Sequence, residues 1–283
     1  MTAAPAPAAP AAPAGTGHPG PELRRASFFD VVHSEWTKLR TVRSTWFTLA
    51  ATAVLTIGIG ALIAAAASGQ FDKASPSSRA SWDPTAISDS GVALAQIAIA
   101  VLGVLAITAE YSTGMIRSSL LAVPRRVRVL MAKVLVFAAV GVVVGEVLCF
   151  VSFYLGQALI QNNGAPYVHL GDPQVLRAVI GSGLYLAALG LLGMALGFLV
   201  RNTALSIVLV VVIAFVLPGV GAALPTNLRH SFEKFWPTQA GGQIGNVYRA
   251  AHTLSPWAGF LELCLVILVL LVGGALLLRY RDA

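Results

Sequence analysis

Apolar residues along the chain gather in six long runs, and segments rich in charged, polar or proline residues separate them. The runs lie at residues 45–67, 90–109, 133–160, 176–200, 204–224 and 257–279. A helix that crosses the roughly 30 Å hydrocarbon core of a bilayer needs about 20 apolar residues, and each run reaches about that length. The pattern therefore predicts an all-α integral membrane protein with six transmembrane helices.

A different pattern precedes the first run. Residues 1–21 are almost wholly Ala, Pro and Gly, and a stretch of this kind cannot bury enough surface to offset its loss of conformational entropy. We therefore expect a disordered tail at residues 1–21 and a six-helix transmembrane domain at residues 45–283.

Residues 28–44, between the tail and the first run, have the spacing of an amphipathic helix. The apolar stripe consists of Phe29, Val32, Trp36, Leu39 and Val42. Most of the charged residues, among them Lys38 and Arg40, lie off this stripe. A basic amphipathic helix with a Trp on its apolar side is typical of the membrane surface, so we expect an interfacial helix. The alternative is a plain helical stem that leads into the first span.

Composition and charge agree with a lipid environment. Hydrophobic residues make up 57% of the chain and charged residues only 11%, whereas soluble domains carry roughly 25% charged residues. The net charge of +7 does not indicate a nucleic-acid partner, because the basic residues lie in short segments beside apolar runs. Thirteen of the 19 Lys and Arg residues fall on the side of the two termini and six on the other side. Basic residues concentrate in cytoplasmic loops, so both termini are predicted to be cytoplasmic.

The sequence offers no arrangement for catalysis or for a cofactor. It contains no GxxxxGK[ST] phosphate loop, no HExxH and no CxxC motif, and its five His residues are scattered singly over tail and loops. Cys149 and Cys264 lie inside apolar runs and are expected to act as small hydrophobes. We therefore expect a non-enzymatic protein without a metal site, and any ATP that it uses must be bound by another chain.

The segment at residues 110–128, between the second and third runs, is the most informative one. Glu110 lies at the C-terminal end of the second predicted span, where the helix dipole opposes a carboxylate, so we expect a cationic partner for it. Gly114 can end that helix, because glycine takes the left-handed cap conformation without penalty. Residues 115–123 then predict a short helix, and Pro124 discourages its continuation.

This short helix has one apolar face, and basic residues follow it. The face consists of Ile116, Leu120 and Val123, and the basic residues are Arg125, Arg126, Arg128 and Lys133. An apolar face outside the spans indicates a surface offered to a soluble partner. The alternative is a basic loop that only sets the topology.

Two segments resemble a known family. The sequence SEWTKLRTVRS at residues 34–44 resembles the helix before the first span of bacterial ABC transporter permeases of the type-2 exporter class. The sequence EYSTGMIR at residues 110–117, with Leu120-Leu121 and Pro124 to Arg126, resembles the loop between the second and third spans of that family. The resemblance runs from about residue 28 to the end in span count and loop pattern. One departure is Met115, which stands where such loops often have Thr.

The resemblance implies a division of labour in the inner membrane of a bacterium. Two permease subunits, identical or different, form the translocation pathway, and separate ATP-binding-cassette subunits bind ATP and Mg²⁺ and drive export. The short helix would dock on the ATPase. The residues that couple to the ATPase would be Glu110, Gly114, Ile116, Arg117, Leu120, Val123, Pro124, Arg125 and Arg126, and those of the interfacial helix Trp36, Lys38, Leu39 and Arg40.

Two other classes of function stay open. One is a non-transporting membrane scaffold or assembly protein. The other is a secondary transporter, whose sign would be interrupted helices in both halves of the chain. The sequence indicates an interrupted helix only near Pro218, where Pro218 and Gly219 are expected to break the fifth span. We expect the segment at residues 218–256 to dip back into the membrane, since broken helices at depth need a covering of protein or a cavity.

Three polar residues inside the predicted spans are candidates for the pathway. Glu146 lies near the middle of the third span, Gln157 nearer the outer end of that span, and Glu262 in the outer part of the sixth. A charge at the bilayer centre costs about 2.5–3.5 kcal/mol on insertion scales. Glu146 is therefore protonated, paired or facing a wet cavity, and it serves either the pathway or an interhelical hydrogen bond.

Overall fold

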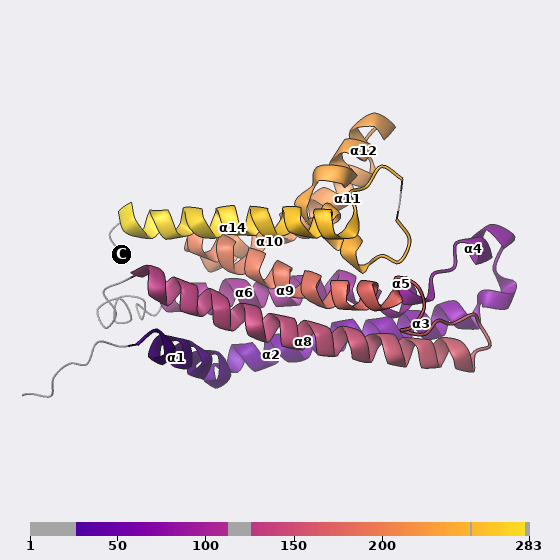
Figure 1. The fold of residues 1–283 in the computed structure, drawn as a ribbon, viewed down its shortest axis with the longest axis horizontal. Helices are drawn as coiled ribbons and strands as arrows, with labels where there is room; N and C mark the ends of the chain where they lie inside the picture. Colours follow the sequence, from indigo (N-terminus) through magenta and orange to yellow (C-terminus); the bar gives the residue numbers. More distant parts are fainter. Residues whose placement is uncertain (1–26, 113–125, 250, 281–283) are drawn as a thin grey trace, which may run out of the picture.

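The computed structural model describes residues 27–112, 126–249 and 251–280, and most of these residues are helical. Six helices are long and apolar enough to cross a membrane: Arg43–Gly69, Val92–Tyr111, Val127–Asn162, Val175–Val200, Thr203–Ala222 and Pro256–Leu277. They lie side by side in an elongated bundle (Figure 1). The prediction of an all-α protein is confirmed, and the described residues contain the predicted number of helices that could span a membrane.

The two ends of the bundle carry different elements (Figure 1). At one end, the α1 end, lie α1 (Phe28–Thr41), the end of α6 (Val92–Ser112), the start of α8 (Arg126–Asn162) and the end of α14 (Pro256–Tyr280). At the other, the α4 end, lie α4 (Pro76–Ala80) and α5 (Pro84–Ser88) after the short η2 (Phe71–Lys73). The α1 end is the one that the charge pattern predicts to be cytoplasmic.

Helix α8 is the longest element and exceeds the predicted span. Its 37 residues extend over about 55 Å at 1.5 Å per residue, well beyond a hydrocarbon core of about 30 Å. It begins at Arg126, seven residues before the predicted start, because Arg and Lys are good helix formers. The basic residues thus mark the edge of the apolar stretch and not the end of the helix.

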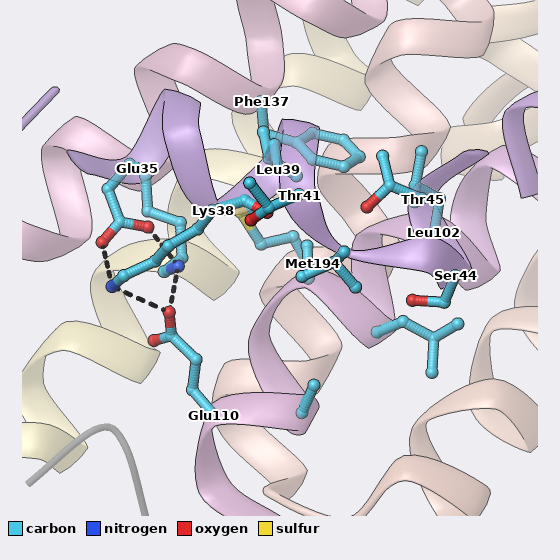
Figure 2. Close-up of a pocket in the computed structure, with 15 residues that line it drawn as sticks. Glu35, Lys38, Leu39, Thr41, Ser44, Thr45, Leu102, Glu110, Phe137 and Met194 are labelled. Carbon is cyan, nitrogen blue, oxygen red and sulfur yellow. Dashed lines mark hydrogen bonds and ion pairs between the residues drawn. The ribbon is translucent and has the colours of Figure 1, made fainter. Parts of the chain in front are cut away.

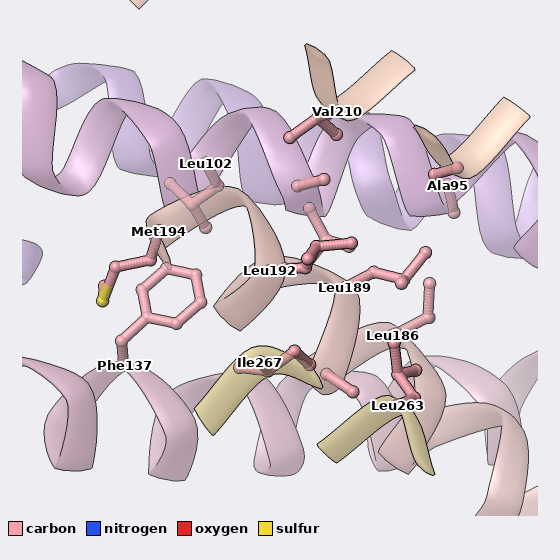
Figure 3. Close-up of a cluster of buried hydrophobic side chains, with 14 of the residues drawn as sticks. Ala95, Leu102, Phe137, Leu186, Leu189, Leu192, Met194, Val210, Leu263 and Ile267 are labelled. Carbon is pink, nitrogen blue, oxygen red and sulfur yellow. The ribbon is translucent and has the colours of Figure 1, made fainter. Parts of the chain in front are cut away.

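Helix α9 (Val175–Val200) forms the centre of the bundle. Of its most apolar stretch 72% is buried, against 50% or less in the other five spans, and it packs against α6, α8, α14 and α10 (Thr203–Val211). Figure 3 shows Phe137 of α8 beside Met194 of α9, with Leu186, Leu189 and Leu192 further along α9. All five side chains are almost completely buried.

Close contact between α6 and α9 depends on glycine residues, which have no side chain. A Cβ atom on Gly193 would lie 2.0 Å from the carbonyl oxygen of Ala100, and one on Gly103 would lie 1.9 Å from that of Gly190. Both distances are far below van der Waals contact, so only glycine fits. The glycines therefore allow the two helix backbones to approach closely.

The helix before the first span is confirmed as α1, but its buried face differs from the predicted one. Val31 and Glu35 are buried, with Val31 packing beside Val129 and Ala132 of α8, whereas Phe29 and Trp36 of the predicted stripe are exposed. Val42 has extended dihedral angles and separates α1 from α2 (Arg43–Ala53). This break favours a separate helix over a continuous stem, and its position in the membrane surface stays a prediction.

The first and fifth spans each contain a π-helical segment. In the first span η1 (Val54–Ile59) joins α2 to α3 (Gly60–Gly69), and in the fifth η3 (Val212–Val216) joins α10 to α11 (Leu217–Ala222). The prediction that Pro218 breaks the fifth span was wrong. The helix continues through Pro218 to Ala222, because the wider π turn before it absorbs the disturbance that proline causes.

The π turn leaves one carbonyl group without a backbone donor. The N–H of Leu217 donates to the carbonyl of Val212, five residues back. In this register the carbonyl of Ile213 would pair with Pro218, which has no N–H. Instead, Ile213 accepts hydrogen bonds from Trp236 Nε1 at 3.0 Å and from Thr238 Oγ1 at 3.4 Å. The chain after the fifth span is thereby tied back to it.

That segment consists of α12 (Thr226–Phe235), α13 (Pro237–Gly242) and η4 (Gln243–Gly245). Helix α13 packs against α14, where Gly241 lies against the buried Leu263. Arg177 of α9 donates to the carbonyls of Ile244 and Asn246 at 2.8 and 2.7 Å. The expectation that residues 218–256 dip into the membrane stays a prediction, since contacts with α9 and α14 do not locate the bilayer.

Candidate functional site

Four charged residues from three helices meet at the α1 end: Glu35 and Lys38 of α1, Glu110 in the last turn of α6, and Lys133 in the second turn of α8. Lys133 Nζ lies 2.8 Å from Glu110 Oε1 and also contacts Glu35 Oε2. Lys38 Nζ lies 2.6 Å from Glu35 Oε1 and 3.1 Å from Glu110 Oε1. Figure 2 shows this arrangement, which we call the four-charge cluster.

The four-charge cluster is electrically balanced and largely buried. The side chains of Glu35, Glu110 and Lys133 are 4%, 8% and 8% exposed, and that of Lys38 is 27% exposed. Ionised side chains tolerate such burial only when they are paired and hydrogen-bonded. Each carboxylate here contacts both ammonium groups, so the cluster holds α1, α6 and α8 together through interactions that no single helix could satisfy.

The environment of Lys38 favours its charged form. Burial disfavours the ammonium ion, but the hydrogen bond that Lys38 donates to Glu35 and the charge of Glu110 outweigh this effect and raise the pKa of Lys38 above its usual value. The lysine therefore stays charged over the whole physiological pH range.

A largely apolar cavity of about 350 Å³ lies beside the four-charge cluster, between α1, α2, α6, α8 and α9. Its floor includes Leu39, Leu102, Phe137 and Met194 (Figure 2). Its polar margin is formed by the cluster and by Thr41, Ser44 and Thr45. The cavity can accommodate an apolar group with a polar end.

A second set of contacts at the same end connects α6 to two further elements, the turn between α9 and α10 and helix α14. The guanidinium of Arg201, in the turn between α9 and α10, lies 5.4 Å from the centre of the Tyr111 ring at the end of α6, within the range of a cation–π interaction. Arg201 also donates to the carbonyl of Leu277 of α14 at 3.4 Å. Glu110 and Tyr111 are the first residues of the EYSTG motif. Glu110 is thus held by Lys38 and Lys133, and Tyr111 by Arg201.

Most of the residues predicted to couple to an ATPase lie outside the described part of the structure. These are Gly114, Ile116, Arg117, Leu120, Val123, Pro124 and Arg125, and the side chain of Arg126 is not described either. Glu110 is described, and the prediction that a cation compensates it is confirmed by Lys38 and Lys133.

The predicted residues of the interfacial helix have different environments. Lys38 belongs to the four-charge cluster, and Leu39 lines the cavity beside it. Arg40 is exposed, and its carbonyl accepts a hydrogen bond from Trp46 Nε1 at 2.9 Å. Trp36 lies on the other side of α1, along an apolar groove between α1 and α8.

Sequence reasoning did not select Glu35 and Lys133 as site residues. The signals were nevertheless present: Glu35 precedes Lys38 by three residues, the spacing of neighbours on one helix face. Lys133 is a lone cation that extends into an apolar stretch, where a charged group needs a partner. Together they could have indicated a pairing between α1 and α8.

The three polar residues predicted inside the spans do not lie at the four-charge cluster. Gln157 donates to the carbonyl of Pro84 and to Ser88 Oγ, each at 3.0 Å, and accepts from the N–H of Val168 at 2.9 Å. Its amide is therefore engaged in holding the α4 end together. Both carboxylate oxygens of Glu146 and Oε2 of Glu262 are buried without a hydrogen-bond partner among the described residues. A pathway role of these residues stays a prediction.

Within the described residues, no group of three or more His, Cys, Asp or Glu side chains could hold a metal ion. The geometry of the described residues at the α1 end provides charged and apolar contacts that connect several helices.

The fold and the four-charge cluster define a multi-pass membrane protein whose first helix is fastened to the second and third spans. Residues 31–217, about two thirds of the chain, match the ABC-2 family transporter protein family. The chain therefore belongs to this family, as the membrane component of a transporter. The matched region contains all four residues of the cluster. No curated protein matches the chain.

Proposed function

We propose that this chain is the membrane-spanning permease subunit of an ATP-driven exporter. It works as a dimer, with itself or with a related subunit, in the inner membrane of a bacterium, and a separate ATP-binding-cassette subunit binds ATP and Mg²⁺. Family membership supports a transporter over a scaffold or assembly protein. The lack of a phosphate loop in the sequence supports a separate ATPase.

The four-charge cluster is the observation that carries this proposal. Residues 113–125 connect α6 to α8, and the cluster contains Glu110, three residues before this connection, and Lys133, in the second turn of the helix that follows it. A partner that pushes on the connection would act on α6, α8 and α1 together, because buried ion pairs couple the three helices. ATP binding on the partner could in this way change the packing of several spans at once.

The orientation follows from the same assignment. The α1 end, where the described part of the chain begins and ends and where α6 ends and α8 begins, faces the cytoplasm, where the ATPase is located. The excess of basic residues in the segments at this end supports the orientation.

The decisive experiment is to change the predicted docking face without changing a span. Leu120→Asp is expected to give a normally inserted protein that no longer co-purifies with its ATPase or stimulates ATP turnover. The loss of one large apolar anchor at an interface costs about 2 kcal/mol, or roughly thirtyfold in affinity, and a buried charge costs more. Ile116→Asp should behave alike.

Leu228→Asp is the matched control. Leu228 is a leucine on α12 whose side chain is 60% exposed, so the same substitution there should leave ATPase binding and turnover unchanged. A fully coupled ATPase in both Leu120→Asp and Ile116→Asp would exclude this face as the docking site.

A further inference from the structure

The turn between α5 and α6, at residues 88–91, is deeply embedded between the first span, α8 and α9. The carbonyl of Ser88 accepts a hydrogen bond from Ser152 Oγ at 2.8 Å, and the hydroxyl of Ser88 accepts one from Gln157 and donates to Pro84. A Cβ atom on Gly91 would lie 2.1 Å from the carbonyl oxygen of Thr56. The turn is therefore held by direct backbone contact and by satisfied hydrogen bonds.

Asp89, the next residue, is buried in the same turn but lacks such partners. Its exposed fraction is 7%, and neither carboxylate oxygen has a hydrogen-bond partner among the residues that the structure describes. Asp83, six residues earlier, has the opposite environment: its carboxylate caps α5 by accepting from the N–H groups of Thr85 and Ala86, each at 3.0 Å. An ionised carboxylate buried in this way carries a large desolvation cost.

The groups that face Asp89 do not neutralise a negative charge. The hydroxyl of Ser182 on α9 faces the carboxyl without normal hydrogen-bond geometry, and Asp83 on α5 adds a like charge. Helix α8 carries Glu146 and Cys149. The buried thiol of Cys149 experiences the negative charges of both Glu146 and Asp89. Among the described residues no Lys, Arg or His acts on Asp89. Burial, opposed in part by Ser182, raises the pKa of Asp89 from 3.8 to about 8.

We propose that Asp89 is a proton-binding site that fastens the α5–α6 turn into the bundle. The carboxyl carries a proton while the turn is packed against α8 and α9, and it releases the proton to water when the turn separates from them. The chemistry is one reversible O–H bond, with the solvent as acceptor. The proposal concerns the chain itself and does not depend on the ATPase.

The direction of the pH effect follows from linkage. A carboxyl whose pKa is higher in the packed state stabilises packing fully only below its ordinary pKa, 3.8. As pH rises from there toward about 8, the packed state loses relative stability by about tenfold per pH unit. Alkaline conditions therefore open the turn, and acidic conditions close it.

Cys149 provides a reporter of this opening, since its side chain is completely buried. The experiment uses full-length protein with Cys264→Ala in nanodiscs. The rate at which a maleimide labels Cys149 is measured as a function of pH, once with native Asp89 and once with Asp89→Asn. Asparagine has the shape of the protonated carboxyl and does not titrate. The ratio of the two rates, with native Asp89 over Asp89→Asn, should rise by about tenfold per pH unit between about pH 5 and about pH 8.

Asp83→Asn is the control. Asparagine also caps helices, and the carboxylate of Asp83 already accepts hydrogen bonds from Thr85 and Ala86. This variant should keep the pH dependence of the protein with native Asp83. A ratio for Asp89→Asn that does not change with pH would show that Asp89 does not bind a proton in this range.

Infrared spectroscopy of the same preparations tests the proton directly and does not depend on labelling. The protein with native Asp89 should show a protonated carboxylic acid band at neutral pH that weakens in Asp89→Asn and not in Asp83→Asn. An unchanged band in Asp89→Asn would mean that Asp89 is ionised and would overturn the proposal.

Discussion

Replacing Lys133 with Met should be among the most destabilising single changes at the α1 end. Lys133 Nζ contacts Glu35 and Glu110, and all three side chains are at most 8% exposed. Its loss leaves two buried carboxylates that share the partly exposed Lys38. Removing one partner of a buried ion pair costs about 3–5 kcal/mol, so Lys133→Met should lower the free energy of unfolding by about that amount.

Lys38→Met should cost much less, although Lys38 contacts the same two carboxylates. Its side chain is 27% exposed, and Lys133 still bridges Glu35 and Glu110 in the variant, so we expect a loss of about 1 kcal/mol. The free energy of unfolding can be measured by steric trapping in bicelles. In the double variant Glu35→Gln with Lys133→Met, part of the loss should be recovered because one unpaired carboxylate is removed.

The exposed pair of Arg229 and Glu233 provides the baseline for these measurements. Their side chains are 48% and 31% exposed, and an exposed pair four residues apart on a helix contributes about 0.3–0.5 kcal/mol. Arg229→Met should therefore change the free energy of unfolding by no more than this. Equal losses in Lys133→Met and Lys38→Met would refute the argument that burial sets the strength of the cluster.

Two further predictions concern packing and orientation. Gly193→Ala places a methyl group against the α6 backbone and should lower the free energy of unfolding by about 1–3 kcal/mol, whereas Gly219→Ala, with open space around it, should cost less than 1 kcal/mol in the same measurement; equal losses would contradict the packing argument. In a background without native cysteines, Ser77→Cys and Ser231→Cys should react with an impermeant thiol reagent from outside the cell, and Ser34→Cys should not. Outside labelling of position 34 would reverse the proposed orientation.

Much of the fold could be predicted because the membrane imposes simple rules. Run length fixed the number of spans, and the helix dipole at Glu110 indicated a cationic partner, which the structure provides. The partner itself could not be chosen from sequence, since Lys38 and Lys133 lie 72 and 23 residues away along the chain. Only tertiary packing decides which of several basic residues reaches a given carboxylate.

Local rules failed where the backbone can adjust or where a polar residue is buried. Pro218 predicted a break, but a π turn kept the fifth span continuous. Asp89 lies in a short polar segment between helices, and such segments are usually at the surface. Nothing in its neighbours along the chain indicates that α8 and α9 enclose it, so no sequence pattern selects Asp89.

The proline in the fifth span has a consequence beyond the shape of that helix. Because Pro218 cannot donate to Ile213, an acceptor is permanently reserved for Trp236 and Thr238. Any other residue at position 218 would bring its own N–H and compete with the two side chains. A substitution that makes the helix more regular would thus weaken the two hydrogen bonds that tie Trp236 and Thr238 to the fifth span.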